Sequence, residues 1–232
     1  MNGWPAGTAS GMVEQMQHAP LREIQGPAGR LEALLEPPVL EPGQSLRAAV
    51  VFGHPLPTDG GTMHTKVVYR ATKALARIGC AVLRFNFRGV GSSEGTWDEG
   101  AGELADFRAA LDAMAARYPD ADLWAAGFSF GSYIALTVGA TDPRVRLLLG
   151  IAPPVDRYDF EAVRSSTKPK FFIQGEMDEL CPLKRMYEFY AQLAEPKELV
   201  VIDAANHLFD GKVLEVGDAV EDLLGDYKTP SH

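Results

Sequence analysis

Runs of nearly continuous apolar residues alternate with stretches of helical periodicity through most of this chain. The apolar runs occupy residues 48–52, 80–87, 122–127, 147–151, 171–173 and 199–202. A strand that is apolar at every position is buried on both faces, which is typical of a parallel sheet with helices on each side. The stretches between the runs repeat apolar residues at helical spacing, as in Val67, Ala71, Ala74 and Ile78. The alternation predicts an α/β fold with a mostly parallel sheet and helices on both faces.

The length of 232 residues fits one domain of this kind. Hydrophobic residues make up 46% of the chain and charged residues 23%, enough for a full core with a solvated surface. We expect residues 1–20 to be a flexible leader and residues 21–232 to form a single α/β domain. No repeat of domain scale and no long low-complexity linker divides the second part.

The net charge of −9 excludes several classes of partner. An acidic surface repels phosphate backbones and anionic lipid, so we expect no nucleic-acid or membrane partner. No apolar stretch approaches the roughly 20 residues that cross a bilayer, and the N-terminus lacks a secretory signal pattern. The two cysteines make no disulfide framework. We therefore expect a cytoplasmic protein without a metal or cofactor, with the oligomeric state left open.

Residues Gly127-Phe128-Ser129-Phe130-Gly131 are the strongest functional signal. They follow an apolar run and precede a helical stretch, which is the context of a G-x-S-x-G elbow with serine at the apex of a sharp strand-to-helix turn. The two glycines remove side chains that such a turn cannot accommodate. Ser129 would then stand exposed and strained at a helix N-terminus, where N–H groups face developing negative charge. We predict that Ser129 is a nucleophile.

Further motifs occur in a fixed order along the chain: His54-Pro55-Leu56-Pro57, Gly60 to Met63, Arg84 to Ser93, the elbow, Ala152-Pro153-Pro154, Gly175 to Asp178 and Asn206-His207. With these motifs the chain resembles the α/β-hydrolase superfamily over nearly all of Arg30 to Tyr227. More narrowly, it is similar to small lidless bacterial serine hydrolases and esterases of the dienelactone hydrolase-like and acyl-peptidase-related branch. The resemblance implies an α/β-hydrolase fold and a Ser-acid-His triad in that chain order.

The chain departs from this family at identifiable positions. Ser129 stands where dienelactone hydrolase itself has cysteine, so that particular activity is not implied. The His-Gly-Gly-Gly oxyanion motif of hormone-sensitive-lipase-like esterases is absent. His64 occupies a position where an acidic or amide residue is expected, and we assign it no role.

A serine hydroxyl needs a base, and the family order selects His207 from the five histidines. His18, His54 and His64 precede Ser129, and His232 is the last residue. His207 lies in the loop between the last apolar run and the last helical stretch. We predict that it takes the proton from Ser129.

The orienting acid must lie between Ser129 and His207, on a loop after a strand. Asp178 fits best, because it follows the apolar run 171–173, and its carboxylate would fix the His207 tautomer. Asp142, Asp156 and Asp159 come too early in the chain, beside the loop of the previous strand. Glu176, Glu179 and Asp203 remain as alternatives, with Asp203 as the fallback acid.

An oxyanion hole needs two backbone donors. Phe130, the residue after the nucleophile, is expected to supply one. Pro55 and Pro57 have no N–H, so Leu56 between them is the expected second donor. His54 is expected to brace this loop rather than to transfer protons.

The span from Ala152 to Pro169 is too short for a cap domain, so we expect an open site. Such a site suits small or soluble esters, and Trp97, Tyr133, Tyr158 and Phe160 are candidates for its walls. The predicted function is a serine carboxylesterase that cleaves short-chain acyl esters through an acyl-enzyme on Ser129. Two alternatives remain. The first is an enzyme with the same triad but another substrate class, either a thioesterase or an amidase or peptidase. The second is a non-catalytic binding protein on a hydrolase fold. Cys181 is a weaker candidate for the nucleophile than Ser129, because it does not stand in an elbow motif.

Overall fold

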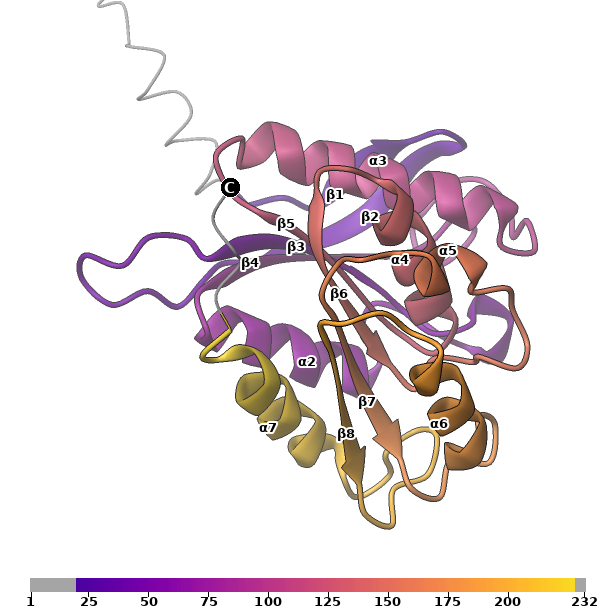
Figure 1. The fold of residues 1–232 in the computed structure, drawn as a ribbon. Helices are drawn as coiled ribbons and strands as arrows, with labels where there is room; N and C mark the ends of the chain where they lie inside the picture. The colour runs from indigo at the N-terminus through magenta and orange to yellow at the C-terminus, as the bar shows by residue number, and fades with distance from the viewer. Residues whose placement is uncertain (1–19, 228–232) are drawn as a thin grey trace, which may run out of the picture.

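The computed structural model describes residues 20–227. The expected leader, residues 1–20, lies outside the described residues apart from Pro20. One eight-stranded sheet runs through the described part, in the order β1-β2-β4-β3-β5-β6-β7-β8 (Figure 1). Its strands are β1 Glu23–Gly26, β2 Gly29–Glu36, β3 Ala48–Gly53, β4 Cys80–Phe85, β5 Leu123–Phe128, β6 Val145–Ile151, β7 Lys170–Gly175 and β8 Lys197–Ile202.

The helices alternate with the strands from β3 onward. They are the 3-10 turn η1 Pro57–Asp59, then α2 Lys66–Arg77, α3 Ala101–Arg117, α4 Phe130–Thr141, α5 Glu161–Arg164, α6 Leu183–Ala191 and α7 Val213–Leu224. Within the described residues, no helix is both long and apolar enough to cross a membrane.

The predicted α/β fold is confirmed, because the six strands from β3 to β8 pair in parallel. Successive strand residues enter opposite cores, as the pleat requires. Ala49 and Val51 pack in the core under α3 and α4, whereas Val50 and Phe52 pack in the core under α2 and α7. Figure 1 shows α2 and α7 together on one face of the sheet, with α3 and α4 on the other.

The pattern of apolar runs did not predict the first two strands. β1 and β2 form an antiparallel hairpin, and β2 also pairs antiparallel with β4. Both strands bury only alternate residues, such as Ile24 in β1 and Leu31 and Ala33 in β2. A strand at the sheet edge that is covered on one face has no continuous apolar run, so the signal used for the other strands is missing here.

The span between β6 and β7 carries only α5, a helix of four residues. The expectation that no large cap covers the site is therefore confirmed. Because β3, β5, β7 and β8 are parallel, the loops that follow them emerge at the same edge of the sheet. These four loops carry Leu56, Ser129, Asp178 and His207.

Candidate active site

Ser129 occupies the turn between β5 and α4 with a strained backbone. Its φ of 52° and ψ of −123° lie outside the regions that side-chain-bearing residues favour. The Ser129 N–H donates to the carbonyl of Ile151 at 2.8 Å, and the Ser129 carbonyl accepts from both the backbone N–H and the hydroxyl of Ser132, at 2.8 and 2.6 Å. The surrounding bonds thus hold a conformation that the isolated turn would avoid.

The elbow glycines are required by backbone packing. A Cβ at Gly127 would overlap the carbonyl of Gly131, and a Cβ at Gly131 would overlap the carbonyl of Gly53 at the end of β3. Sequence reasoning expected collisions at both positions, and the structure identifies the groups involved. The contact between Gly131 and Gly53 also brings the loop after β3 against the first turn of α4.

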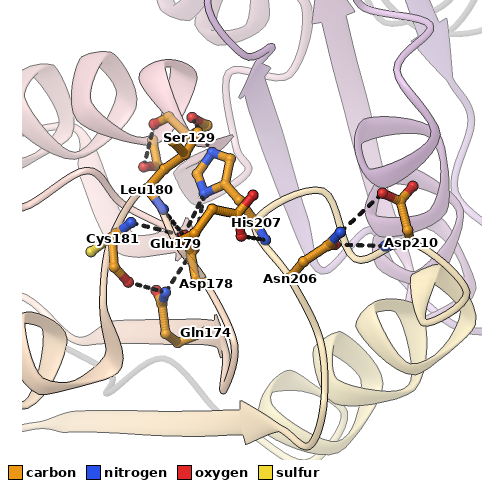
Figure 2. A network of polar contacts seen from close by, with 10 residues as sticks. Ser129, Gln174, Asp178, Glu179, Leu180, Cys181, Asn206, His207 and Asp210 are labelled. Atoms are coloured by element: carbon orange, nitrogen blue, oxygen red, sulfur yellow. Dashed lines mark hydrogen bonds and ion pairs between the residues drawn. The ribbon is translucent and has the colours of Figure 1, made fainter.

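His207 joins Ser129 to Asp178 through its two ring nitrogens (Figure 2). Nε2 lies 2.8 Å from the Ser129 hydroxyl oxygen. Nδ1 lies 3.0 and 2.9 Å from the two carboxylate oxygens of Asp178. Both His207 and Asp178 are buried, and the Phe128 ring stacks on the imidazole at 5.6 Å between centroids. The structure thus brings the three predicted residues into one hydrogen-bonded chain, with only Ser129 partly exposed.

The Asp178 carboxylate is surrounded by donors besides His207. The N–H groups of Leu180 and Cys181 donate to Oδ1 at 2.9 and 2.8 Å. The Gln174 amide donates to Oδ2 at 2.8 Å. A carboxylate with this many donors is held in one orientation.

The alternative acids bond elsewhere. Glu176 accepts from the backbone of Ala204 at 2.9 Å, and Glu179 accepts from the His207 backbone N–H at 3.4 Å. Asp203 is exposed. Among the described residues, Asp178 alone has a carboxylate bonded to the His207 ring.

The two predicted oxyanion donors belong to adjoining loops. Leu56 lies between Pro55 and Pro57, and its carbonyl accepts from Asp59 and Gly61 at 3.2 and 3.0 Å, which fixes the turn. Phe130 is the first residue of α4. The N–H groups of Leu56 and Phe130 donate to no backbone carbonyl within the described range 20–227. Both are therefore free to donate to an added oxygen.

The aromatic residues proposed as pocket walls gather around Phe130. Trp97 and Tyr158 lie 5.1 and 5.8 Å from its ring centroid, and Tyr133 lies 6.2 Å away. Tyr133 and Tyr158 stack in parallel at 4.4 Å. Phe160 is fully buried and packs in the core, whereas Trp97, Tyr133 and Tyr158 are half-buried and pack against the same core.

His54 is buried in the loop after β3, as expected for a bracing residue. Its Nδ1 donates to the Pro55 carbonyl at 2.7 Å, and its Nε2 accepts from the Phe87 N–H at 3.1 Å. These bonds require the neutral ring, and burial lowers the pKa of His54 to about 4. His54 therefore ties its loop to the segment after β4.

Within residues 20–227, neither the Cys181 thiol nor the His64 ring bonds to Ser129 or to the ring of His207. Cys181 is fully buried, and burial raises the pKa of its thiol to about 12. A thiol of this kind is a poor nucleophile at neutral pH. His64 is exposed, and its backbone N–H donates to the Thr62 hydroxyl at 3.1 Å.

Sequence reasoning missed Gln174 and the stacking of Phe128 on His207. Gln174 did leave a signal, because it is the polar residue of the otherwise apolar segment Phe171 to Gly175. Phe128 left none, since an aromatic residue at the end of a buried strand is ordinary packing. In the part of the chain that the structure describes, no group of three metal-binding side chains occurs.

Comparisons with known proteins bear on the family and the fold. The family model described as "Serine aminopeptidase, S33" matches residues 44–161, half of the chain. An uncharacterised protein of Rickettsia prowazekii is 36% identical over 210 residues, which cover 87% of each chain.

Two solved structures are similar over almost their whole length. An alpha-beta serine hydrolase homologue from Coxiella burnetii is 37% identical with a TM-score of 0.81, covering 89% of this chain and 97% of that one. A protein from Xanthomonas campestris, described as an α/β serine hydrolase without lid, is 35% identical with a TM-score of 0.82, covering 92% and 96%.

Proposed function

This chain belongs to the S33 serine aminopeptidase family within the α/β-hydrolase superfamily, and on that premise we propose that it is a serine carboxylesterase. It would cleave short-chain acyl esters through an acyl-enzyme on Ser129. The observation that carries this proposal is the continuous hydrogen-bonded chain from the Ser129 hydroxyl through His207 to Asp178. A serine hydroxyl, an imidazole and a buried carboxylate in this order are the groups that nucleophilic acyl transfer uses.

In the proposed reaction, the Ser129 oxygen attacks the ester carbonyl while His207 Nε2 takes the hydroxyl proton. The resulting imidazolium is stabilised by Asp178, and the oxyanion accepts hydrogen bonds from the N–H groups of Leu56 and Phe130. His207 then gives the proton to the leaving alkoxide, which departs as the alcohol. Water, deprotonated by the same nitrogen, attacks the acyl-enzyme carbonyl; the bond from the acyl carbon to Ser129 Oγ breaks, the acid leaves, and His207 returns the proton to Ser129.

The open surroundings of Ser129 support a small substrate. α5 is the one helix between β6 and β7, and it has four residues. The half-buried rings of Trp97, Tyr133 and Tyr158 offer limited apolar surface beside the elbow. A site of this form holds a short acyl group better than a long lipid chain, which needs an extended apolar channel.

The description of the family model favours a second candidate, an amidase or peptidase that uses the same residues. Amide and thioester cleavage require the same nucleophile, base and oxyanion donors and differ in the leaving group that His207 protonates. The panel of substrates described below separates these activities. We further propose that the enzyme acts in the cytoplasm on a small-molecule substrate, without a cofactor and without a nucleic-acid or membrane partner.

The test combines an active-site label with a substrate panel. We expect a fluorophosphonate probe to modify the wild type and not Ser129→Ala. We expect p-nitrophenyl butyrate to be hydrolysed faster than a butyryl thioester or an amino-acid anilide. Labelling of both proteins to the same extent, or of neither, would favour a non-catalytic binding protein. Preferred cleavage of the thioester would indicate a thioesterase, and preferred cleavage of the anilide would indicate an amidase or peptidase.

A further inference from the structure

Gln174 is a fully buried polar side chain at the end of β7 that the reaction proposed above does not use. Its Nε2 donates to Asp178 Oδ2 at 2.8 Å and to the Cys181 carbonyl at 2.9 Å (Figure 2). Its Oε1 is buried without a hydrogen-bond partner in the part of the chain that the structure describes. Two acceptors thus fix the orientation of the amide, because a flipped amide would turn its oxygen toward a carboxylate and a carbonyl.

The two oxygens of Asp178 depend on different donors. Oδ1 accepts from the backbone N–H groups of Leu180 and Cys181, which any residue at those positions would supply. Apart from the His207 ring, Gln174 supplies the one recorded donor to Oδ2 within residues 20–227. Rotation of the carboxylate about its Cβ–Cγ bond is therefore restrained on one side by the chain and on the other by this side chain.

The unpartnered Oε1 is a cost of placing Gln174 at this position, because a buried acceptor without a partner loses the free energy of its hydrogen bond to water. The two bonds that Nε2 donates, to Asp178 and to the Cys181 carbonyl, offset that cost. The neighbouring positions Phe172 and Ile173 are apolar and fully buried, so the strand itself does not require a polar residue here. A polar side chain at a buried strand position is better explained by a function in the active site than by a contribution to the stability of the fold.

We propose that Gln174 is a positioning residue that fixes the orientation and charge of Asp178 and, through Asp178, the basicity of His207. This inference rests on the proposed hydrolase function. The amide donor stabilises the Asp178 anion and so limits how strongly that anion holds a proton on His207. Without the donor, Asp178 would turn more freely and would hold the imidazolium more tightly. The charged groups next to His207 are Asp178 and, at its backbone, Glu179, both on the loop after β7.

Gln174→Met tests the donor, because methionine has nearly the same length and no N–H. We expect kcat for p-nitrophenyl butyrate to fall about tenfold or more with KM nearly unchanged. We expect the acid limb of the pH–rate profile to move to higher pH by roughly half a unit or more. The melting temperature should fall modestly, because Asp178 Oδ2 and the Cys181 carbonyl lose their shared donor, and the removal of the unpartnered oxygen offsets part of that loss. Ile173→Val, a buried change on the same strand that removes no hydrogen bond, should leave the pH profile in place.

Gln174→Glu provides a conservative rescue. When the introduced carboxyl is protonated, its O–H donates to Asp178 Oδ2, and the rate should return toward that of the wild type. When it ionises, two carboxylates face each other and the rate should fall. We therefore expect a descending limb at higher pH that neither the wild type nor Gln174→Met shows.

The ring ¹⁵N shifts of His207 in the full-length protein give a readout that needs no turnover. In Gln174→Met the midpoint of their pH titration should move upward relative to the wild type. Unchanged midpoints together with an unchanged kcat would overturn the positioning role, and a lower melting temperature with an unchanged pH profile would show a structural role instead. If the wild type shows neither Ser129-dependent hydrolysis nor labelling, the proposed function fails, and the titration still decides whether Gln174 acts on His207.

Discussion

His54 and His207 have the same side chain at comparable places in the fold, and the structure gives them different tasks. Each follows a parallel strand, β3 for His54 and β8 for His207, and each is almost inaccessible, with exposures of 0% and 3%. His54 bonds through both nitrogens to backbone groups, those of Pro55 and Phe87. His207 bonds through both nitrogens to side chains that can exchange protons, those of Ser129 and Asp178.

The comparison shows that burial after a strand does not make a histidine a base. Burial and the Phe87 N–H hold His54 in its neutral form, and within residues 20–227 no carboxylate bonds to its ring. The buried carboxylate of Asp178 bonds to the His207 ring, the arrangement that the proposed proton uptake from Ser129 requires. The partner of the second ring nitrogen therefore separates a bracing histidine from a proton-transferring one.

The largest expected effect is on turnover. We expect His207→Ala to lower kcat/KM for p-nitrophenyl butyrate at least about a thousandfold, or about 4 kcal/mol of transition-state stabilisation. The matched variant His54→Gln keeps a donor and an acceptor and should stay within about tenfold of the wild type. Similar losses in both variants would break the distinction between the two histidines.

The next effect is on stability at acid pH. The pKa of His54 falls from an ordinary 6.5 to about 4 in the fold. As the pH falls below 6.5, His54 binds a proton in the unfolded chain but not in the folded protein. The free energy of unfolding should therefore decrease by about 3 kcal/mol by pH 4. Urea unfolding of the wild type and His54→Gln at about pH 7 and about pH 4.5 measures this difference. The decrease should be smaller in the variant, and equal decreases in both would mean that His54 does not hold its ring neutral.

The smallest expected effect concerns Cys181, a third buried titratable group near the site. Its thiol has a pKa of about 12 because of burial, and only its backbone contacts Asp178. We expect Cys181→Ala to change kcat/KM by less than about twofold and iodoacetamide to leave the folded protein unmodified at neutral pH. Rapid modification with loss of activity would require a new account of the loop after β7.

Much of the fold was predictable because its central strands are buried on both faces. Val50 and Val51 enter opposite cores, so both must be apolar, and the run is visible in the sequence. The hairpin of β1 and β2 was not predictable by that signal, since Ile24 and Leu31 are buried between exposed neighbours. Its pairing with β4 is a long-range contact with no local signature.

The site was predictable where its chemistry requires a local sequence. Gly127 and Gly131 must lack side chains around Ser129, and Leu56 lies between two prolines that have no N–H. The assignment of Asp178 needed more than local pattern, because Glu176, Glu179 and Asp203 were also available. The structure distinguishes them by the direction of each carboxylate, which depends on the turns of two loops from different strands.

By itself, the sequence determined the alternation of strands and helices, the position of the elbow and the absence of a large cap, because each depends on residues adjacent in the chain. The tertiary structure alone decided which acid contacts His207, which histidine is held neutral by burial, and that Gln174 reaches the second oxygen of Asp178. These contacts join loops up to 78 residues apart, as between Ser129 and His207. Their hydrogen bonds depend on distance and direction in space, which no local pattern of residues specifies.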